Sequence, residues 1–102
     1  MACKVNWTPK AWQTFNENIT YLEENWTEKE IIRFVSLVDE KITNLSKHPK
    51  IGSPRNAKHS NIRFMLVHKR VALIYRFKPR KNEIELLVFW NTYQNPSNNK
   101  FK

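Results

Sequence analysis

The sequence predicts an α+β domain in which two helices pack on a small antiparallel sheet. Apolar residues recur at helical spacing in the first half of the chain, whereas they alternate with polar residues in the second half, as in strands. The period changes at a segment containing Pro and Gly, near residues 49–56. A chain of 102 residues with 40% hydrophobic residues supports one modest core. We therefore expect a single domain over residues 1–102 with the element order β-α-α-β-β-β.

The chain opens with a short strand and a helix. Lys4–Trp7 alternates polar and apolar residues, which predicts a strand. Thr8 followed by Pro9 is typical of a helix start, because Thr caps the first turn and Pro at the first helical position loses no hydrogen bond. One apolar helix face follows and predicts a helix to about Asn25: Trp12, Phe15, Ile19 and Leu22.

A second helix begins after Thr27. Thr27 and Glu30 fit the capping box, in which each side chain satisfies the other's backbone N–H. A long apolar stripe follows: Ile31, Phe34, Val35, Val38, Ile42 and Leu45. His48 precedes Pro49, and a residue before proline is displaced from helical geometry, so the helix ends there. Only about two residues separate the helices, which predicts an antiparallel hairpin whose aromatic residues lie in the core.

The second half contains the expected sheet. Its three strands are Ile62–His68, Arg70–Lys78 and Glu83–Trp90. The residues expected to face the helices are Val71, Leu73, Tyr75 and Phe77 on the middle strand, and Ile84, Leu86, Val88 and Trp90 on the last. Pro79–Asn82 predicts a turn, and 50–61 a loop. We expect about 91–102 to form a flexible tail.

All of the net positive charge lies in the second half. Residues 1–50 hold seven Lys/Arg and seven Asp/Glu, whereas residues 51–102 hold eleven Lys/Arg and only Glu83 and Glu85. The second half therefore accounts for the whole formal charge of +9. Such a balance indicates a partner rather than a fold, and points to an acidic macromolecule.

The composition argues against several classes of site. With Gly52 as the one glycine, a glycine-rich phosphate loop is not expected. With Cys3 as the one cysteine and three scattered His, neither a disulfide nor a metal site is expected. The sequence shows no apolar leader and no apolar run of membrane-spanning length, so we expect a cytoplasmic protein without a cofactor or membrane partner.

The basic residues divide into two groups. A solvated edge or turn position accounts well for Lys69, Arg80 and Lys81, and for Lys69 a contact with the target is the alternative. Arg76 differs, because a mid-strand cation among apolar neighbours is costly unless it meets an anion. The residues expected to contact an acidic target or nucleic acid are Lys58, His59, Lys69, Arg70 and Lys78.

Three blocks of the sequence resemble the RelE/ParE toxin superfamily, and together with the topology they cover nearly the whole chain. They are Gly52-Ser53-Pro54, the segment Asn61–Arg76 with its Ile-Tyr-Arg strand, and Phe89–Pro96 with its closing Gln-Asn-Pro. The resemblance implies a toxin of a bacterial type II toxin–antitoxin module, of the kind linked to plasmid stabilisation. It also implies an acidic antitoxin that wraps the toxin.

The resemblance leaves two targets. RelE-like members cleave messenger RNA in the ribosomal A site, which would assign catalysis to Arg63, Arg76 and Tyr93. ParE-like members inhibit DNA gyrase. The stretch Val88–Gln94 lacks the cation that many RelE-like toxins place there, and the Gln-Asn-Pro and Gly-Ser-Pro blocks look closer to ParE. We therefore favour a ParE-like toxin. The alternatives are a ribosome-dependent mRNA endoribonuclease and a non-toxic nucleic-acid-binding module.

Overall fold

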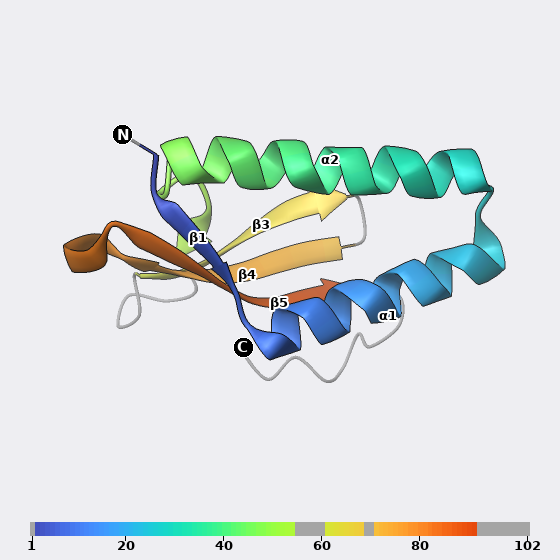
Figure 1. Ribbon diagram of the computed structural model, residues 1–102, viewed down its shortest axis with the longest axis horizontal. Helices are drawn as coiled ribbons and strands as arrows, with labels where there is room; N and C mark the ends of the chain where they lie inside the picture. The colour runs from blue at the N-terminus through green and yellow to red at the C-terminus, as the bar shows by residue number, and fades with distance from the viewer. Residues whose placement is uncertain (1, 55–60, 69–70, 92–102) are drawn as a thin grey trace.

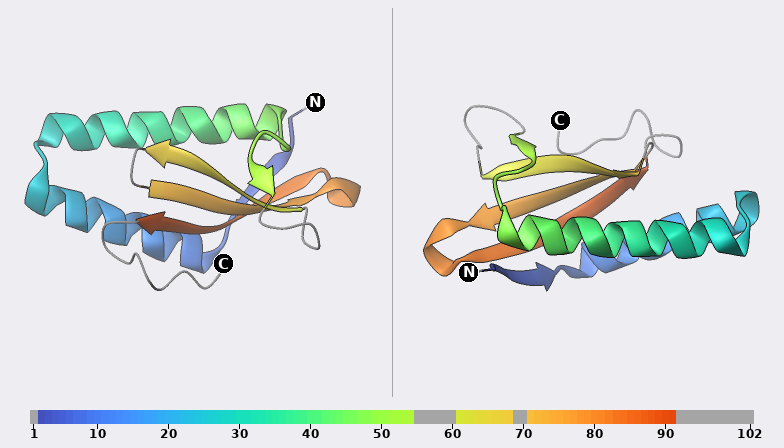
Figure 2. Two further views of the ribbon diagram at one scale, coloured as in Figure 1. Left: turned by 180° about the vertical axis from the view of Figure 1, so that it is seen from behind. Right: turned by 90° about the horizontal axis from the view of Figure 1, so that it is seen from above.

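The computed structural model describes residues 2–54, 61–68 and 71–91, which form one sheet covered on one face by two helices (Figures 1 and 2). In chain order the elements are β1 (Lys4–Trp7), α1 (Pro9–Asn25), α2 (Glu28–Lys47), β2 (Ser53–Pro54), β3 (Ile62–His68), β4 (Val71–Lys78), the 3-10 turn η2 (Pro79–Lys81) and β5 (Glu83–Asn91). The expected order β-α-α-β-β-β is confirmed. The short strand β2 is an addition within the expected loop, and Asn91 belongs to β5 rather than to the tail.

Local side-chain signals define the helix ends, as the sequence predicts. The hydroxyl of Thr8 accepts a hydrogen bond from the Ala11 N–H at 3.1 Å. Thr27 and Glu30 form the reciprocal capping box. The second helix ends at His48, whose N–H donates to the last turn. Because each signal acts over a few residues, the helical hairpin follows from the sequence alone.

The sheet has the strand order β1-β5-β4-β3-β2. β2, β3, β4 and β5 pair antiparallel in turn, whereas β1 pairs with β5 in parallel. A parallel pair needs a long connection, and here both helices and three strands lie between its two members. β1 therefore joins the start of the chain to its last described strand.

β5 contains one extra residue relative to β4, between Leu86 and Val88. Beyond this bulge the alternation of faces is reversed. Phe89 joins the core with 2% exposure, while Val88 and Trp90 lie on the face away from the helices. The expectation that Val88 and Trp90 face the helices is therefore wrong, because a period-two pattern does not reveal an inserted residue.

The core lies between the helices and the sheet, and aromatic rings fill one side of it. Trp7 stacks on Trp12 with ring centroids 4.1 Å apart, and it also contacts Phe15 and Phe89. Trp12 is nonetheless 48% exposed, because Trp7 lies between it and the deeper core. The helix-face residues expected in the core are thus largely confirmed, but Trp12 lies at its margin and Val35 is exposed.

Side chains of α1 and of its capping residue hydrogen bond to the edge of β5, from the point where β1 stops onward. The Thr8 hydroxyl donates to the Leu86 carbonyl at 2.7 Å. The Thr14 hydroxyl accepts from the Phe89 N–H at 2.9 Å, and the Asn18 amide donates to the Phe89 carbonyl at 3.2 Å. The helix thereby satisfies backbone groups that another strand would otherwise satisfy.

We predict that Thr14→Val destabilises the fold by about 1–3 kcal/mol, because the shape is retained while the Phe89 N–H loses its partner. Urea unfolding followed by circular dichroism measures the change. Thr20→Val is the matched control: its exposed hydroxyl bonds only within α1, so its cost should stay within about 0.5 kcal/mol. Equal losses in the two variants would contradict the role assigned to Thr14.

Candidate functional site

Arg76 lies on β4, on the sheet face that points away from the helices. Its register neighbours are Ile62 on β3 and Glu85 on β5. The Arg76 Nη1 atom lies 3.5 Å from Glu85 Oε1, and the arginine side chain is 46% exposed. The anion that a mid-strand cation requires is therefore supplied within the chain itself.

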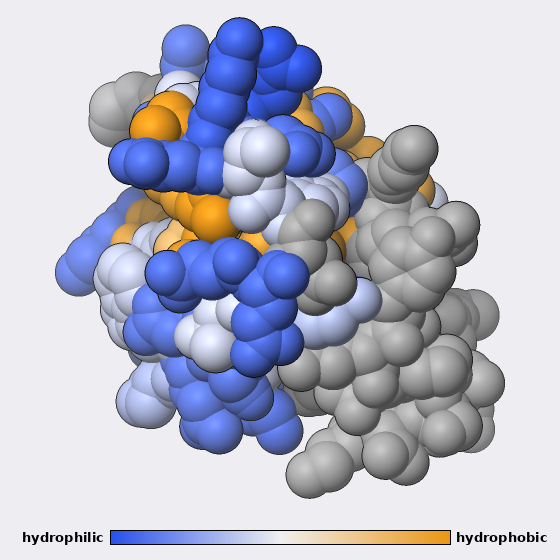
Figure 3. All heavy atoms as spheres, turned by 90° about the vertical axis from the view of Figure 1, so that its right-hand side faces the viewer, coloured by the Kyte–Doolittle hydropathy of each residue, from blue (hydrophilic) through white to orange (hydrophobic). Residues whose placement is uncertain are grey.

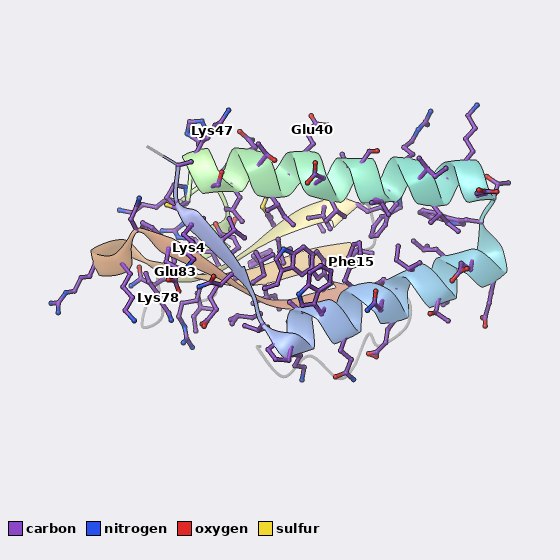
Figure 4. The ribbon with its side chains drawn as sticks, in the orientation of Figure 1. Lys4, Phe15, Glu40, Lys47, Lys78 and Glu83 are labelled. Atoms are coloured by element: carbon purple, nitrogen blue, oxygen red, sulfur yellow. The ribbon has the colours of Figure 1, made fainter. Side chains whose placement is uncertain are left out.

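Lys78 extends the same row of charges. Its Nζ atom lies 3.4 Å from Glu85 Oε2 and 3.8 Å from Glu83 Oε1. Glu85 thus bridges both cations. Glu83 contacts Lys78 at the end of the row, and Figure 4 shows these two residues on neighbouring strands. Surface ion pairs of this kind contribute only about 0–1 kcal/mol. The 46% exposure of the Arg76 side chain nevertheless leaves part of its guanidinium open to an anion from outside the chain.

Arg63 lies on the opposite face of the sheet. It pairs with Tyr75, a core residue, whereas the adjacent Ile62 pairs with Arg76. The Arg63 Nη1 atom donates to the Gly52 carbonyl at 2.7 Å and to the Lys50 carbonyl at 3.2 Å. Arg63 therefore holds the segment before β2 against the sheet and does not share a surface with Arg76.

Tyr75 fixes the same segment from inside the core. Its hydroxyl accepts from the Gly52 N–H at 3.0 Å and donates to the Pro49 carbonyl at 2.9 Å. A Cβ atom at Gly52 would lie 2.6 Å from that hydroxyl and 2.8 Å from the Phe64 carbonyl oxygen. The single glycine of the chain is therefore required for close approach, not for a turn.

Burial raises the pKa of the Tyr75 phenol above its ordinary value of 10.0. The Gly52 N–H and the positive charge of Arg63 act in the opposite direction, because both favour the phenolate, but they offset only part of the shift. Tyr75 thus stays protonated at neutral pH and keeps its bond to Pro49. Its position and protonation indicate a structural role.

The remaining residues predicted for the site lie outside the described residues. They are Lys58, His59, Lys69, Arg70 and Tyr93. Within the described part, sequence reasoning missed the two glutamates that neutralise the cations. Glu83 and Glu85 stand two residues apart on one strand, and so do Arg76 and Lys78 on its neighbour. This matched spacing is a signal that was present in the sequence.

The described residues contain no cluster of three or more His, Cys, Asp or Glu side chains suited to a metal ion. Among those same residues, no helix is both long enough and apolar enough to span a lipid bilayer. What the described site can do chemically is bind an anion through Arg76 and Lys78.

Comparison with known proteins identifies the family. Residues 5–96 match the family model described as the ParE toxin of the type II toxin–antitoxin system parDE. The chain belongs to the ParE toxin family. It is accordingly a toxin of the type II toxin–antitoxin class, as the resemblance in its sequence implied. A search of the curated proteins found no match.

Solved structures share the fold of this ParE-family toxin at low sequence identity. One is the chromosomal ParDE system of P. aeruginosa, with TM-score 0.70, 16% identity, and coverage of 88% of this chain and 96% of that chain. The RelBE2 toxin–antitoxin complex of Mycobacterium tuberculosis gives TM-score 0.63 and 14% identity, with coverage of 89% of this chain and 99% of that chain. A mutant of the E. coli toxin RelE in the free state gives TM-score 0.63 and 10% identity, with coverage of 94% of this chain and 90% of that chain.

We predict that Tyr75→Phe destabilises this toxin by about 1–3 kcal/mol at neutral pH, because Gly52 and Pro49 each lose a buried partner. The difference in unfolding free energy between Tyr75→Phe and the wild type should become smaller as pH rises above about 10. A raised folded-state pKa gives stability that is complete below the unfolded pKa and is lost as pH rises through the folded pKa. Guanidinium unfolding of both proteins at a series of pH values measures this gap; a gap independent of pH would refute the assignment.

Proposed function

We propose that this toxin arrests bacterial growth by inhibiting DNA gyrase in the cytoplasm, and that an acidic antitoxin neutralises it. Membership of the ParE toxin family supports growth arrest. The structural relatives include toxin–antitoxin complexes, which supports an antitoxin partner for this chain. The formal charge of +9 favours an acidic one.

We favour gyrase over messenger RNA as the target because Arg63 and Arg76 lie on opposite faces of the sheet. Cleavage of RNA by attack of a 2′-hydroxyl needs a base, an acid and cations around one phosphate. Arg63 and Arg76 do not face a common phosphate, and the Arg63 guanidinium bonds two backbone carbonyls. This separation argues against the nuclease set and favours a toxin that acts by binding its target.

We expect induction of the chain to halt growth and the purified protein to inhibit supercoiling of relaxed plasmid by gyrase. In a reconstituted translation reaction, primer extension should find no new cuts in the messenger RNA. Discrete cuts together with normal supercoiling would replace this proposal with the ribosome-dependent endoribonuclease. Undisturbed growth in cells that contain the soluble chain would contradict toxicity itself.

Arg76→Ala should weaken gyrase inhibition about tenfold, the equivalent of about 1.4 kcal/mol, because one cation is lost from the anion-binding face. The concentration for half-maximal inhibition measures the effect. Arg33→Ala removes the same charge from the exposed surface of α2 and should leave inhibition unchanged. If Arg76→Ala keeps full potency with an unaltered unfolding midpoint, Arg76 lies outside the target surface.

A further inference from the structure

Three elements meet at the end of the molecule that holds the β4–β5 connection. The Cys3 N–H donates to the Ser46 carbonyl at 2.7 Å, which joins the start of β1 to the last turn of α2. The Lys4 N–H donates to the Asn82 carbonyl at 3.1 Å, which joins β1 to the residue after η2. Backbone hydrogen bonds therefore bring together segments that lie far apart in the sequence.

Four cations occupy this junction, and we call them the basic end: Lys4, Lys47, Arg80 and Lys81. All four are exposed. Within the described part of the chain, the ion pairs involve only Arg76 and Lys78. Glu83 lies beside Lys4 in the strand register but pairs with Lys78, so no carboxylate forms an ion pair with the basic end. Figure 4 shows Lys4 and Lys47 at the same end of the molecule as Lys78.

Among the described residues, those at the opposite end of the molecule are mostly acidic. Where α1 meets α2, the chain carries Glu23, Glu24, Glu28 and Glu30 with Lys29 as the one cation in that stretch. Figure 1 shows this junction and η2 at opposite ends of the long axis, which measures 41 Å. Figure 3 views the acidic end, where hydrophilic side chains flank a narrow band of hydrophobic ones. Among the described residues, the charge is thus separated along the molecule.

The surroundings of the basic end favour phosphate over a protein surface. Interfaces between proteins depend on apolar and aromatic anchors. Among the exposed large hydrophobic side chains of the described residues, Ile51 alone lies close to Lys47, in the turn after α2. The others belong to α1, to the first half of α2 and to β3: Trp12, Ile32, Val35, Phe64 and Leu66. Contacts to the nucleic-acid backbone instead use exposed Lys and Arg side chains, which release condensed counterions.

We propose that the basic end binds the phosphate backbone of duplex DNA without sequence preference. The proposed function enters only in the choice of duplex DNA, since gyrase acts on duplexes. Lys4 and Lys47 come from the half of the chain whose charge sums to zero, and Arg80 and Lys81 from the turn. Bound in this way, the toxin directs its acidic end away from the DNA.

The test measures binding of the purified 102-residue chain to a short labelled duplex by fluorescence anisotropy between about 50 and 200 mM salt. Replacing both Arg80→Gln and Lys81→Gln should reduce the slope of log K against log salt by about 2. At about 0.1 M salt the affinity should fall about 60-fold, since each of the two contacts contributes about eightfold by the same relation. Lys4→Gln and Lys47→Gln should each reduce the slope by about 1.

The matched control is Lys29→Gln with Arg33→Gln, two exposed residues of α2 toward the acidic end. This pair removes the same charge and should leave the slope unchanged. An equal effect in the two double variants would show attraction governed by net charge and would overturn the proposal. Tighter binding to polyglutamate than to the duplex would overturn it in favour of an acidic protein.

Neither binding measurement, to the duplex or to polyglutamate, contains gyrase. The DNA-binding proposal and the gyrase proposal can therefore fail independently of each other. In one outcome, the salt slope responds only to substitutions at the basic end while the protein leaves gyrase supercoiling intact. That result would support the DNA-binding surface and refute the gyrase target. The unfolding midpoint of each variant should equal that of the wild type. The differences in salt slope then come from the exposed side chains and not from lost stability.

Discussion

The hydrogen bonds along the outer edge of β5 determine how the rest of the molecule is arranged. β1 pairs along β5 from Lys4 beside Glu83 to Trp7 beside Leu86, and α1 continues along the same edge through Thr14. Each bond contributes about 1 kcal/mol, but each buried group left without a partner would cost about 1–3. The helical hairpin therefore stays on one face of the sheet. The other face is left to Arg76 and Lys78, and Lys4 is placed beside the turn.

Strand alternation then gives similar cations different roles. Arg63 and Arg76 both lie on strands among apolar neighbours, and their register positions differ by one residue across β3 and β4. That single step places the Arg63 guanidinium against the carbonyls of the segment before β2. It places Arg76 beside a carboxylate on the open face. One arginine contributes to the fold, and the other is available to an anionic partner.

Sequence reasoning succeeded where the controlling contacts are local. The caps at Thr8 and Thr27 act within one turn, and the strand pattern of β4 is short and regular, so the helices and the central strand follow directly. It failed where one residue changes the register or where distant segments meet. The bulge of β5 and the parallel pairing of β1 depend on contacts across most of the chain. The role of Gly52 depends on Tyr75, 23 residues away.

The site was also only partly predictable, because a count of charges along the sequence does not show which of them lie side by side in the fold. On the open face Glu83 and Glu85 offset the charges of Arg76 and Lys78, so this face adds little long-range field, although the half-exposed Arg76 guanidinium can still contact an anion directly. The basic end instead combines turn residues with two lysines from the neutral half. Its separation from the acidic end, along an axis of 41 Å, exceeds the screening length of about 8 Å at physiological salt several times. The glutamates of the hairpin therefore do not weaken attraction at the basic end, and the position of the four cations determines which way the toxin faces the DNA.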